Sequence, residues 1–314
     1  MQKISNFIDS ALFNSASGYY RKKNPIGKNA DFITAPEISQ VFGELIAAYI
    51  LQIASTKKTT FSLVEMGAGK GTLFKDVLTS IQKLADKKIP QAVTFFDRAT
   101  FHIIEINAVL VKIQRENLCK FSVNWHETFE KFLDHHNCEE IFFVSNELFD
   151  CFAIDQFVKT NLGWCEKIIE EIAGKKRFAL REFDHEINDF VENLLGKKIS
   201  QAAPINAIFE YSESARNFMS ELCEALKKRG GMALIIDYGY EKTEFANTLQ
   251  AIKNHQKTFI LENVGKTDIT ALVDFFALKK IANNFDLNSS LISQREFLLA
   301  LGLDERRKIL LQKK

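Results

Sequence analysis

Apolar and polar residues follow two different periods along this chain, and each period predicts one kind of element. Apolar residues recur at helical spacing over residues 4–16 and again from Pro36 to about Ser55, which predicts two amphipathic helices. The second has its proline in the first turn, where a missing backbone N–H costs least. Short apolar runs typical of buried strands then alternate with amphipathic segments. The predicted strands cover residues 61–67, 101–106, 141–145 and 233–237, and the helices between them cover residues 70–84 and 107–117.

This alternation predicts a mainly parallel sheet with helices on both faces, and therefore an α/β fold. Residues 156–204 interrupt it with short strand-like runs separated by glycine-containing turns, which predicts an inserted antiparallel β/α subdomain. Its predicted strands cover residues 157–159, 164–169 and 177–180, and a helix covers residues 185–195. We therefore expect a helical lid (residues 1–58), a sheet domain (residues 59–155 and 205–314) and an insertion (residues 156–204) that shapes a substrate cleft.

Glycines at every second position follow the first predicted strand, in the segment Glu65-Met66-Gly67-Ala68-Gly69-Lys70-Gly71-Thr72. Glycine permits positive φ angles and lets a ligand approach the backbone, and the N–H groups of a helix start favour a polar or anionic ligand. The dinucleotide fingerprint G-x-G-x-x-G fits poorly, because Thr72 stands where it requires the third glycine. A glutamate before the glycines, E-x-G-x-G-x-G, is instead the pattern of class I S-adenosylmethionine (SAM) methyltransferases. A plain strand-to-helix turn is the alternative.

Polar side chains at the carboxyl ends of the predicted strands are candidate ligand contacts, since open α/β sheets bind ligands at that edge. Glu105 ends the second strand, further along than the roughly 20 residues of the dinucleotide fingerprint. Its carboxylate is expected to accept hydrogen bonds from both ribose hydroxyls of the cofactor, with a helix cap or a salt bridge as the alternative. A further short strand, the third of the sheet, is expected just before residues 124–126, so that residues 141–145 form the fourth. Trp125 follows this third strand and could pack on adenine or belong to the core.

Asn146 and Glu147 directly follow the fourth predicted strand and are expected to point polar groups toward the reacting methyl group. Methyl transfer is an in-line displacement, so positioning supplies much of its rate. If the acceptor is a guanidinium nitrogen, carboxylates must orient this donor-only group and balance its charge. Glu147 is the first candidate for this catalytic role and Asp150 the second, with Asn146 contacting the cofactor as well. Capping of the following helix is the alternative for both carboxylates.

Several motifs, in the order of a known family, make the chain resemble the MidA-type methyltransferases. Residues 30–44 read A-D-F-I-T-A-P-E-I-S-Q-V-F-G-E, close to the family pattern G-D-F-x-T-[SA]-P-E-I-S-Q-x-F-G-E. The glycine segment resembles E-L-G-P-G-R-G-T-L, and residues 146–150 resemble N-E-[FL]-[FL]-D. Residues 18–20, the I-D-Y-G at residues 236–239, the T-L-Q-A at residues 248–251 and residues 265–271 fit as well. The resemblance therefore spans most of the chain.

The resemblance implies a class I SAM-methyltransferase fold and protein arginine methylation, because the family includes the mitochondrial complex I assembly factor that dimethylates an arginine of a complex I subunit. It implies that residues 36–40 lie over the methionine end of the cofactor, with a packed helical lid as the alternative. The residues implied to line the entrance for a protein arginine are Tyr19, Tyr20, Thr34, Pro36, Glu37 and Gln40. The expected cofactor contacts are Glu65, Gly67, Ala68, Gly69, Gly71, Thr72, Glu105, Ile106, Trp125 and Asn146.

The chain departs from the family pattern at five positions. Ala30 replaces a glycine, Ala68 and Lys70 replace Pro and Arg in the glycine turn, and Val264 replaces a proline. These changes are compatible with cofactor binding. Leu272 stands where the family often has His, which removes an acid/base or hydrogen-bonding group from that motif.

Composition and charge limit the classes of partner and the compartment that we expect for this protein. A net charge of +1 over 314 residues gives no electrostatic footprint for nucleic acid. No apolar stretch reaches the roughly 18 residues of a membrane helix, and the N-terminus lacks a signal or transit pattern. Five scattered cysteines indicate reduced thiols in a cytosolic compartment, and His135-His136 is interpreted as a polar loop.

We therefore expect a cytoplasmic, bacterial-type methyltransferase that uses SAM, acts on a protein and holds no metal. Two functions remain as alternatives: a small-molecule methyltransferase, and a SAM-binding assembly chaperone with little turnover. The sequence leaves the oligomeric state open, including a homodimer.

Overall fold

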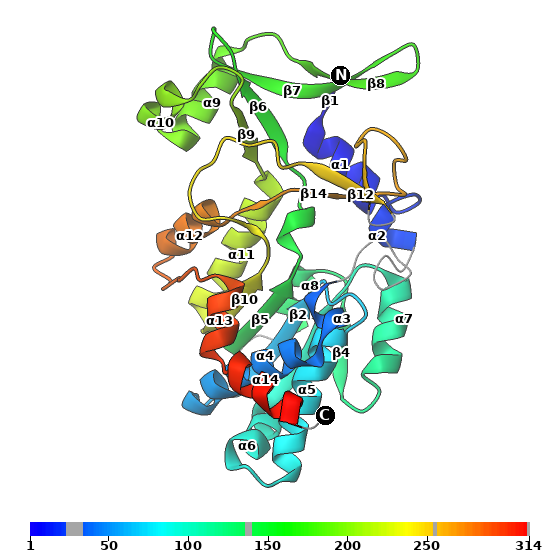
Figure 1. The fold of residues 1–314 in the computed structure, drawn as a ribbon, viewed down its shortest axis with the longest axis vertical. Helices are drawn as coiled ribbons and strands as arrows, with labels where there is room; N and C mark the ends of the chain where they lie inside the picture. The colour runs from blue at the N-terminus through cyan, green and yellow to red at the C-terminus, as the bar shows by residue number, and fades with distance from the viewer. Residues whose placement is uncertain (23–33, 136–139, 254–255, 313–314) are drawn as a thin grey trace. The chain divides into compact units, whose positions relative to one another are not determined.

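The structure is a computed structural model that describes residues 1–22, 34–135, 140–253 and 256–312 (Figure 1). Internal contacts divide the chain into two compact units. The first unit comprises Met1–Lys22, Phe149–Glu221 and Asp237–Phe285, and the second comprises Lys23–Leu148, Leu222–Ile236 and Asp286–Lys314. These units cut the chain at different points from the expected lid, sheet domain and insertion.

The second unit is built on a five-stranded sheet in the order β10-β5-β2-β3-β4, in which every neighbouring pair is parallel. The predicted parallel α/β sheet is confirmed. Parallel pairing brings the carboxyl ends of the strands to one edge, where Met66 pairs with Ile104 and Ile236 pairs with Asn146. The strands are β2 (Phe61–Met66), β3 (Ala99–Ile104), β4 (Val123–His126), β5 (Glu140–Asn146) and β10 (Gly231–Ile236).

Helices of the second unit bury apolar faces in a common core with this sheet. Phe61 and Phe142 stack in that core with ring centroids 4.5 Å apart. Arg306 of α14 donates two hydrogen bonds to Glu44 of α4, at 2.6 and 3.1 Å. The helices are α3 (Ala35–Ile38), α4 (Gln40–Thr56), α5 (Thr72–Asp86), α6 (Pro90–Arg98), α7 (Ala108–Asn117), α8 (Phe129–His135), α13 (Gln294–Ala300) and α14 (Leu303–Gln312).

The prediction of one helix from Pro36 to Ser55 was wrong, because Ser39 divides the segment into α3 and α4. Ser39 has extended backbone angles, and its side chain accepts a hydrogen bond from the N–H of Val41. A serine that caps the second helix in this way cannot also continue the first. The break leaves Glu37 at the end of a short helix of its own.

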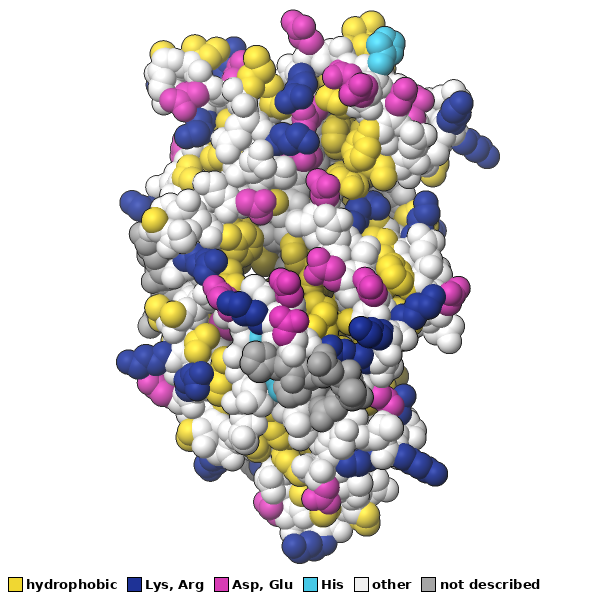
Figure 2. All heavy atoms as spheres, turned by 180° about the vertical axis from the view of Figure 1, so that it is seen from behind, with side chains coloured by type: hydrophobic (Ala, Val, Ile, Leu, Met, Phe, Trp, Pro, Cys, Tyr) yellow, Lys and Arg dark blue, Asp and Glu magenta, His cyan; other side chains and the backbone are white. Residues whose placement is uncertain are grey.

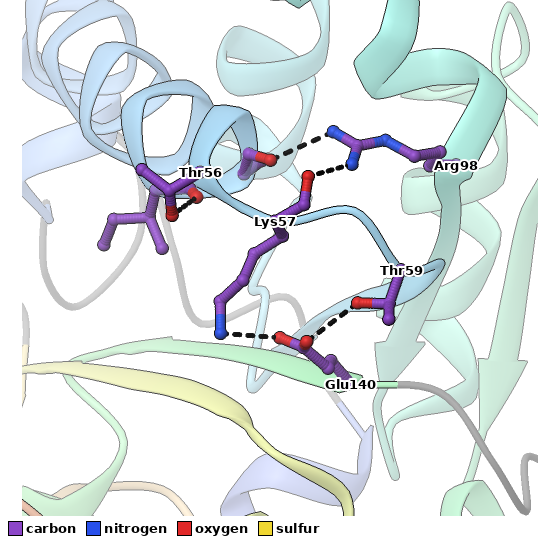
Figure 3. Close-up of polar contacts among 7 residues, drawn as sticks. Thr56, Lys57, Thr59, Arg98 and Glu140 are labelled. Atoms are coloured by element: carbon purple, nitrogen blue, oxygen red, sulfur yellow. Dashed lines mark hydrogen bonds and ion pairs between the residues drawn. The ribbon is translucent and has the colours of Figure 1, made fainter.

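Polar contacts at the amino edge of the sheet join α4, α6 and β5 (Figure 3). Arg98 of α6 donates to the carbonyl oxygens of Ala54 and Lys57, the first at 3.0 Å. The ammonium of Lys57 lies 3.0 Å from the Glu140 carboxylate, which also accepts a hydrogen bond from Thr59 at 2.7 Å. These contacts cap the end of α4 and hold the start of β5, so they brace the edge opposite the glycine turn.

The first unit contains an antiparallel sheet in the order β1-β7-β6-β9, with β8 paired to β7. The predicted antiparallel strands are confirmed, and the sheet also includes a short strand from the N-terminus. The fully buried Trp164 donates its indole N–H to Ser200 at 2.9 Å. The strands are β1 (Gln2–Lys3), β6 (Asp155–Lys159), β7 (Trp164–Ile172), β8 (Lys175–Leu180) and β9 (Ile208–Tyr211).

Short helices and two small sheets complete the first unit. A hydrogen bond between Tyr20 and Asp268 (2.8 Å) explains why residues 1–22 group with residues 237–285. The helices are α1 (Ile4–Phe13), α2 (Tyr19–Lys22), the 3-10 helix η1 (Phe149–Cys151), α9 (His185–Leu195), α10 (Lys197–Ala202), α11 (Glu213–Arg229, which continues into the second unit) and α12 (Phe275–Asn284). The small sheets are β13-β12-β14 (Gln256–Thr258, Gln250–Lys253, Asp268–Thr270) and β11-β15 (Gly239–Tyr240, Val273–Asp274).

The surface carries charges of both signs. On the face shown in Figure 2, Lys and Arg side chains stand among Asp and Glu side chains, in keeping with the net charge of +1. None of the helices in the described residues combines the length and apolar character needed to cross a membrane. No disulfide joins Cys119, Cys151, Cys165 and Cys223, the cysteines of the described residues, while Cys138 and His136 lie outside that part of the chain.

Candidate cofactor and active site

The predicted glycine turn joins β2 to α5. Gly67, Gly69 and Gly71 have φ angles of 70°, 54° and 76°, in the left-handed region that glycine adopts without strain. The turn closes through a 2.7 Å hydrogen bond from the N–H of Gly71 to the oxygen of Ala68. A Cβ added to Gly67 would lie 2.9 Å from Cδ1 of Leu148. The helix starts at Thr72, two residues later than predicted.

Glu65 precedes the turn and lies inside the protein, with a relative exposure of 2 %. Burial raises the pKa of its carboxyl to about 8, and the nearby charge of Glu105 adds to this shift, while a backbone hydrogen bond from Phe74 opposes it. Its Oε2 atom has no hydrogen-bond partner among the described residues. An unsatisfied buried carboxyl suits a ligand that brings donors or positive charge.

Glu105 follows β3 and is held by two donors. Its Oε1 accepts from the backbone N–H of Asn107 at 2.9 Å, and its Oε2 accepts from the side-chain amide of Gln114 at 3.2 Å. Asn107 in turn caps α7 by accepting from the N–H groups of Val109 and Leu110. Ile106, between these residues, is half-buried.

Sequence reasoning missed Gln114. It is fully buried and lies at helical spacing between Leu110 and Leu118. A polar residue in such an apolar series indicates a buried side chain that needs hydrogen-bond partners, and this pattern could have identified it.

Trp125 lies within β4, so its predicted position after the strand was wrong. The indole N–H donates to Oε1 of Gln114 at 3.0 Å, and the guanidinium of Arg115 stacks over the ring at 4.2 Å. The ring also packs against the hydrophobic core of the second unit. Strand β4 starts at Val123 because it pairs with β3 from Phe101 onward.

Asn146 and Glu147 lie together at the carboxyl end of β5. The backbone N–H of Glu147 donates to the oxygen of Ile236 at 2.8 Å, and its φ angle is 51°, a strained value for a residue with a side chain. The amide of Asn146 donates to Oε1 of Glu147 at 3.3 Å. The other end of that amide, Oδ1 of Asn146, is buried with no hydrogen-bond partner among the described residues. Strain and an unsatisfied polar atom at one strand end indicate a functional site.

The segment before α4 contacts the glycine turn through Glu37. Its carboxylate accepts a hydrogen bond from the hydroxyl of Thr72, and Lys70 lies 3.3 Å from it. Pro36 is buried, Thr34 half-buried and Gln40 exposed. The first part of the matching motif, Ala30 to Ile33, lies outside the described residues. Of the entrance residues predicted in the second unit, Glu37 is therefore the one that the fold brings to the cofactor turn.

The other predicted residues, Tyr19, Tyr20 and Asp150, belong to the first unit. Tyr19 is buried, with 1 % of its surface exposed. Burial raises the pKa of Tyr20, whose hydroxyl donates to Asp268. Asp150 is buried in the middle of the 3-10 helix η1 and accepts a hydrogen bond from Tyr238.

Asp237 and Tyr238 were noticed only as part of a family motif, yet they hold the Asp150 turn. Asp237 accepts from the backbone N–H groups of Phe149 (2.9 Å) and Asp150 (3.3 Å). Burial, with the adjacent charge of Asp150, raises the pKa of the Asp237 carboxyl. The sequence alone could not show that Asp237 contacts this turn, because Asp237 and Phe149 are 88 residues apart in the chain.

The second unit thus offers glycines with positive φ angles, a buried carboxyl and an acceptor pair held at the end of β3. The glycines suit a ligand that comes close to the backbone. The buried carboxyl suits the ammonium group of SAM, and the acceptor pair suits its ribose hydroxyls. Among the described residues, no group of three or more His, Cys, Asp or Glu side chains is arranged to hold a metal ion.

Comparison with known proteins identifies the family. The sequence profile of the family described as "Putative S-adenosyl-L-methionine-dependent methyltransferase" matches residues 45–292. The chain is 30 % identical to a mitochondrial protein arginine methyltransferase, NDUFAF7, of Danio rerio over 98 % of this chain and 75 % of that protein. It is 29 % identical to the Homo sapiens protein of the same name, over 99 % and 72 %.

A solved structure shares the fold. A Burkholderia thailandensis protein crystallised with S-adenosyl-homocysteine superimposes with a TM-score of 0.77, at 24 % identity, over 96 % of this chain and 77 % of that one. The fold and the family suggested by the sequence motifs are thereby confirmed. Because the matched profile covers more than half of the chain, this protein belongs to that family of methyltransferases that use S-adenosyl-L-methionine.

Proposed function

We propose that this methyltransferase transfers a methyl group to a guanidinium nitrogen of an arginine in a protein substrate. The observation that carries the proposal is the strained Asn146-Glu147 pair at the carboxyl end of β5. A carboxylate there suits a donor-only cationic acceptor. The relatives in Danio rerio and Homo sapiens, both named protein arginine methyltransferases, support the choice of arginine.

In this mechanism the second unit holds the cofactor. Glu105 would accept hydrogen bonds from the ribose hydroxyls, the glycine turn from Gly67 to Gly71 would let the cofactor approach the backbone, and Glu65 would receive its ammonium group. When bound, SAM supplies an activated methyl group. Ala68, Thr72, Ile106 and Trp125 remain further predicted contacts of the same cofactor.

Glu147 then acts on the acceptor. Its carboxylate accepts hydrogen bonds from the guanidinium, which aligns one nitrogen with the methyl group and balances the positive charge. Asn146 fixes the carboxylate through the 3.3 Å hydrogen bond between their side chains. Asp150, in the first unit, is the second candidate for a carboxylate that binds the substrate. Thr34, Pro36, Glu37 and Gln40 are proposed to contact the substrate or to cover the cofactor, and Tyr19 and Tyr20 remain predicted substrate contacts.

We extend the proposal to the biological setting. The substrate is proposed to be a subunit of respiratory complex I, methylated in the cytoplasm by a monomer or a homodimer. The family resemblance supports the choice of substrate.

The deciding variant is Glu147→Gln, which keeps the shape of the side chain and removes its charge. We expect it to bind SAM as the wild type does and to lose methylation by about 100-fold or more, because removing one stabilising group of a transition state costs that much. Calorimetry measures the binding, and mass spectrometry of candidate complex I subunits measures the methylation. Glu127→Gln is the control, since Glu127 is an exposed carboxylate paired with Lys131.

Each outcome has a consequence for the proposal. Methylation that persists in Glu147→Gln would remove Glu147 from the mechanism. Methyl groups found on a small molecule, or SAM binding without any methylated product, would replace the protein arginine proposal with one of the other two functions.

A further inference from the structure

Gln114 is a buried amide on α7 that joins three parts of the cofactor site. Its Nε2 donates to the backbone oxygen of Gly69 at 2.8 Å and to Oε2 of Glu105 at 3.2 Å. Its Oε1 accepts the indole N–H of Trp125 at 3.0 Å. We propose that Gln114 is a positioning residue that sets the Glu105 carboxylate for recognition of the ribose hydroxyls.

The three partners determine which way the amide faces. Two of them are oxygens and can only accept, and the third is an indole N–H that can only donate. The reversed amide would place Oε1 against two oxygens and its NH₂ group against the indole N–H. All three partners therefore require the orientation in which Gln114 donates to Glu105.

Glu105 gains a defined plane from this arrangement. Asn107 donates to one of its oxygens and Gln114 to the other, so rotation of the carboxylate would break a hydrogen bond. A carboxylate held at both oxygens presents its acceptors to a ribose diol without losing side-chain freedom at the moment of binding. Gln114 thus acts on the cofactor through Glu105. This inference rests on the proposed ribose contact of Glu105 and is independent of the acceptor that receives the methyl group.

The test compares two ligands, S-adenosyl-homocysteine and an analogue that lacks both ribose hydroxyls. The measured quantity is the dissociation constant of the analogue divided by that of S-adenosyl-homocysteine, both from calorimetry on the full chain. This ratio reports hydroxyl recognition and needs no turnover. Gln114→Met removes the amide and keeps a long unbranched side chain, and Gln114→Leu removes it with a branched one, so neither variant can donate to Glu105. We expect both variants to lower the ratio by roughly tenfold, the effect of losing one oriented hydrogen bond to a charged group.

Asn117→Leu is the matched control. Asn117 lies on the same helix and donates to the backbone oxygen of Lys70 in the glycine turn at 2.9 Å. This hydrogen bond holds the turn and does not involve Glu105. We expect this variant to weaken both ligands equally and to keep the ratio of the wild type. A ratio that stays within about twofold of the wild type in both Gln114 variants would overturn the proposal.

A further variant applies if neither of these two Gln114 variants folds. Gln114→Asn keeps a polar amide but shortens the side chain by one methylene, which withdraws the donor from Glu105. We expect the same ratio to fall, and an unchanged ratio would again overturn the inference. A wild-type ratio near one, or Glu105→Gln without effect on it, would refute the ribose contact itself. A lowered ratio in the Gln114 variants, together with a wild-type protein that methylates no arginine, would support the role of Gln114 and refute only the proposed substrate.

Discussion

Among single residues, the proposed cofactor site contains buried polar atoms that lack a hydrogen-bond partner among the described residues. Oε2 of Glu65 and Oδ1 of Asn146 are two such atoms. Each such atom costs roughly 1–3 kcal/mol of stability. A ligand that supplies donors recovers this cost, so these atoms favour the bound state. The pKa of Glu65 makes the effect measurable.

We predict that SAM binding releases a proton from Glu65. Burial holds its pKa at about 8, so at pH 7 the carboxyl is mostly protonated in the free protein. A cationic ligand favours the carboxylate, and affinity should therefore increase as the pH rises from 7 to 8. Calorimetry at pH 7 in two buffers of different ionisation enthalpy counts the protons. The amino group of SAM also titrates in this range and contributes to both proteins, so the difference between wild type and Glu65→Gln reports Glu65. Equal proton release by the two proteins would contradict the assignment.

The same residue predicts a pH-dependent stability. Between the ordinary value of 4.5 and about 8, an unfolded Glu65 is ionised while the folded one keeps its proton. Folding stability is therefore lost as the pH rises through this window, by up to about 1.4 kcal/mol per pH unit. Glu65→Gln should melt at a higher temperature than the cofactor-free wild type at pH 8, and the gap should nearly vanish at pH 4.5. A gap that does not change with pH would refute this reading.

At the scale of elements, short helix α3 is joined to the start of α5 by one side chain. Glu37 contacts both Thr72 and Lys70 of the glycine turn. Lys70 lies in the turn and Thr72 is the first residue of α5, so loss of Glu37 should release α3 and loosen the first turn of α5.

We expect Glu37→Ala to weaken SAM binding by roughly tenfold, and Glu37→Gln, which still accepts from Thr72, to weaken it less; the Lys70 pair is partly exposed and adds little. Calorimetry with SAM measures both variants. Glu44→Ala serves as the control, because it removes a carboxylate of α4 that pairs with Arg306. Binding that is equally strong in Glu37→Ala and Glu44→Ala would mean that α3 plays no part in holding the cofactor.

For the molecule as a whole, the chain forms two compact units, and the proposed cofactor contacts belong to one of them. Glu65, the glycine turn, Glu105 and Asn146 all lie in the second unit. The buried Asp150 and its partners Asp237 and Tyr238 form a polar cluster in the first. Cofactor binding should therefore stabilise the second unit directly.

Hydrogen exchange can test this division. With S-adenosyl-homocysteine at about 100 times its dissociation constant, the binding free energy adds about 2.7 kcal/mol to the stability of the unit that binds it. We expect slower exchange at residues 65–72 and 105–114, and little change in the sheet around Trp164. Equal protection of both sheets would show that the two units open as one.

Much of the site could be predicted from local sequence. Buried strands, the glycine turn and the polar residues after β3 and β5 follow from apolar runs and from glycine, whose effects act within a few residues. The division at Ser39 was missed because apolar periodicity continues across it. Trp125 was misplaced because a short strand between two helices has little alternation to mark it.

Local sequence patterns were enough to predict the parallel α/β sheet, the E-x-G-x-G-x-G turn and, through the motifs, the methyltransferase family. The folded chain was needed to show that Gln114 contacts a glycine 45 positions away, that Asp237 holds the Asp150 turn, and that residues 237–285 group with the N-terminus. These two kinds of information differ in the range over which they act. Backbone periodicity and turn chemistry depend on neighbours in the chain, whereas a buried side chain obtains its hydrogen-bond partners from whichever elements pack around it.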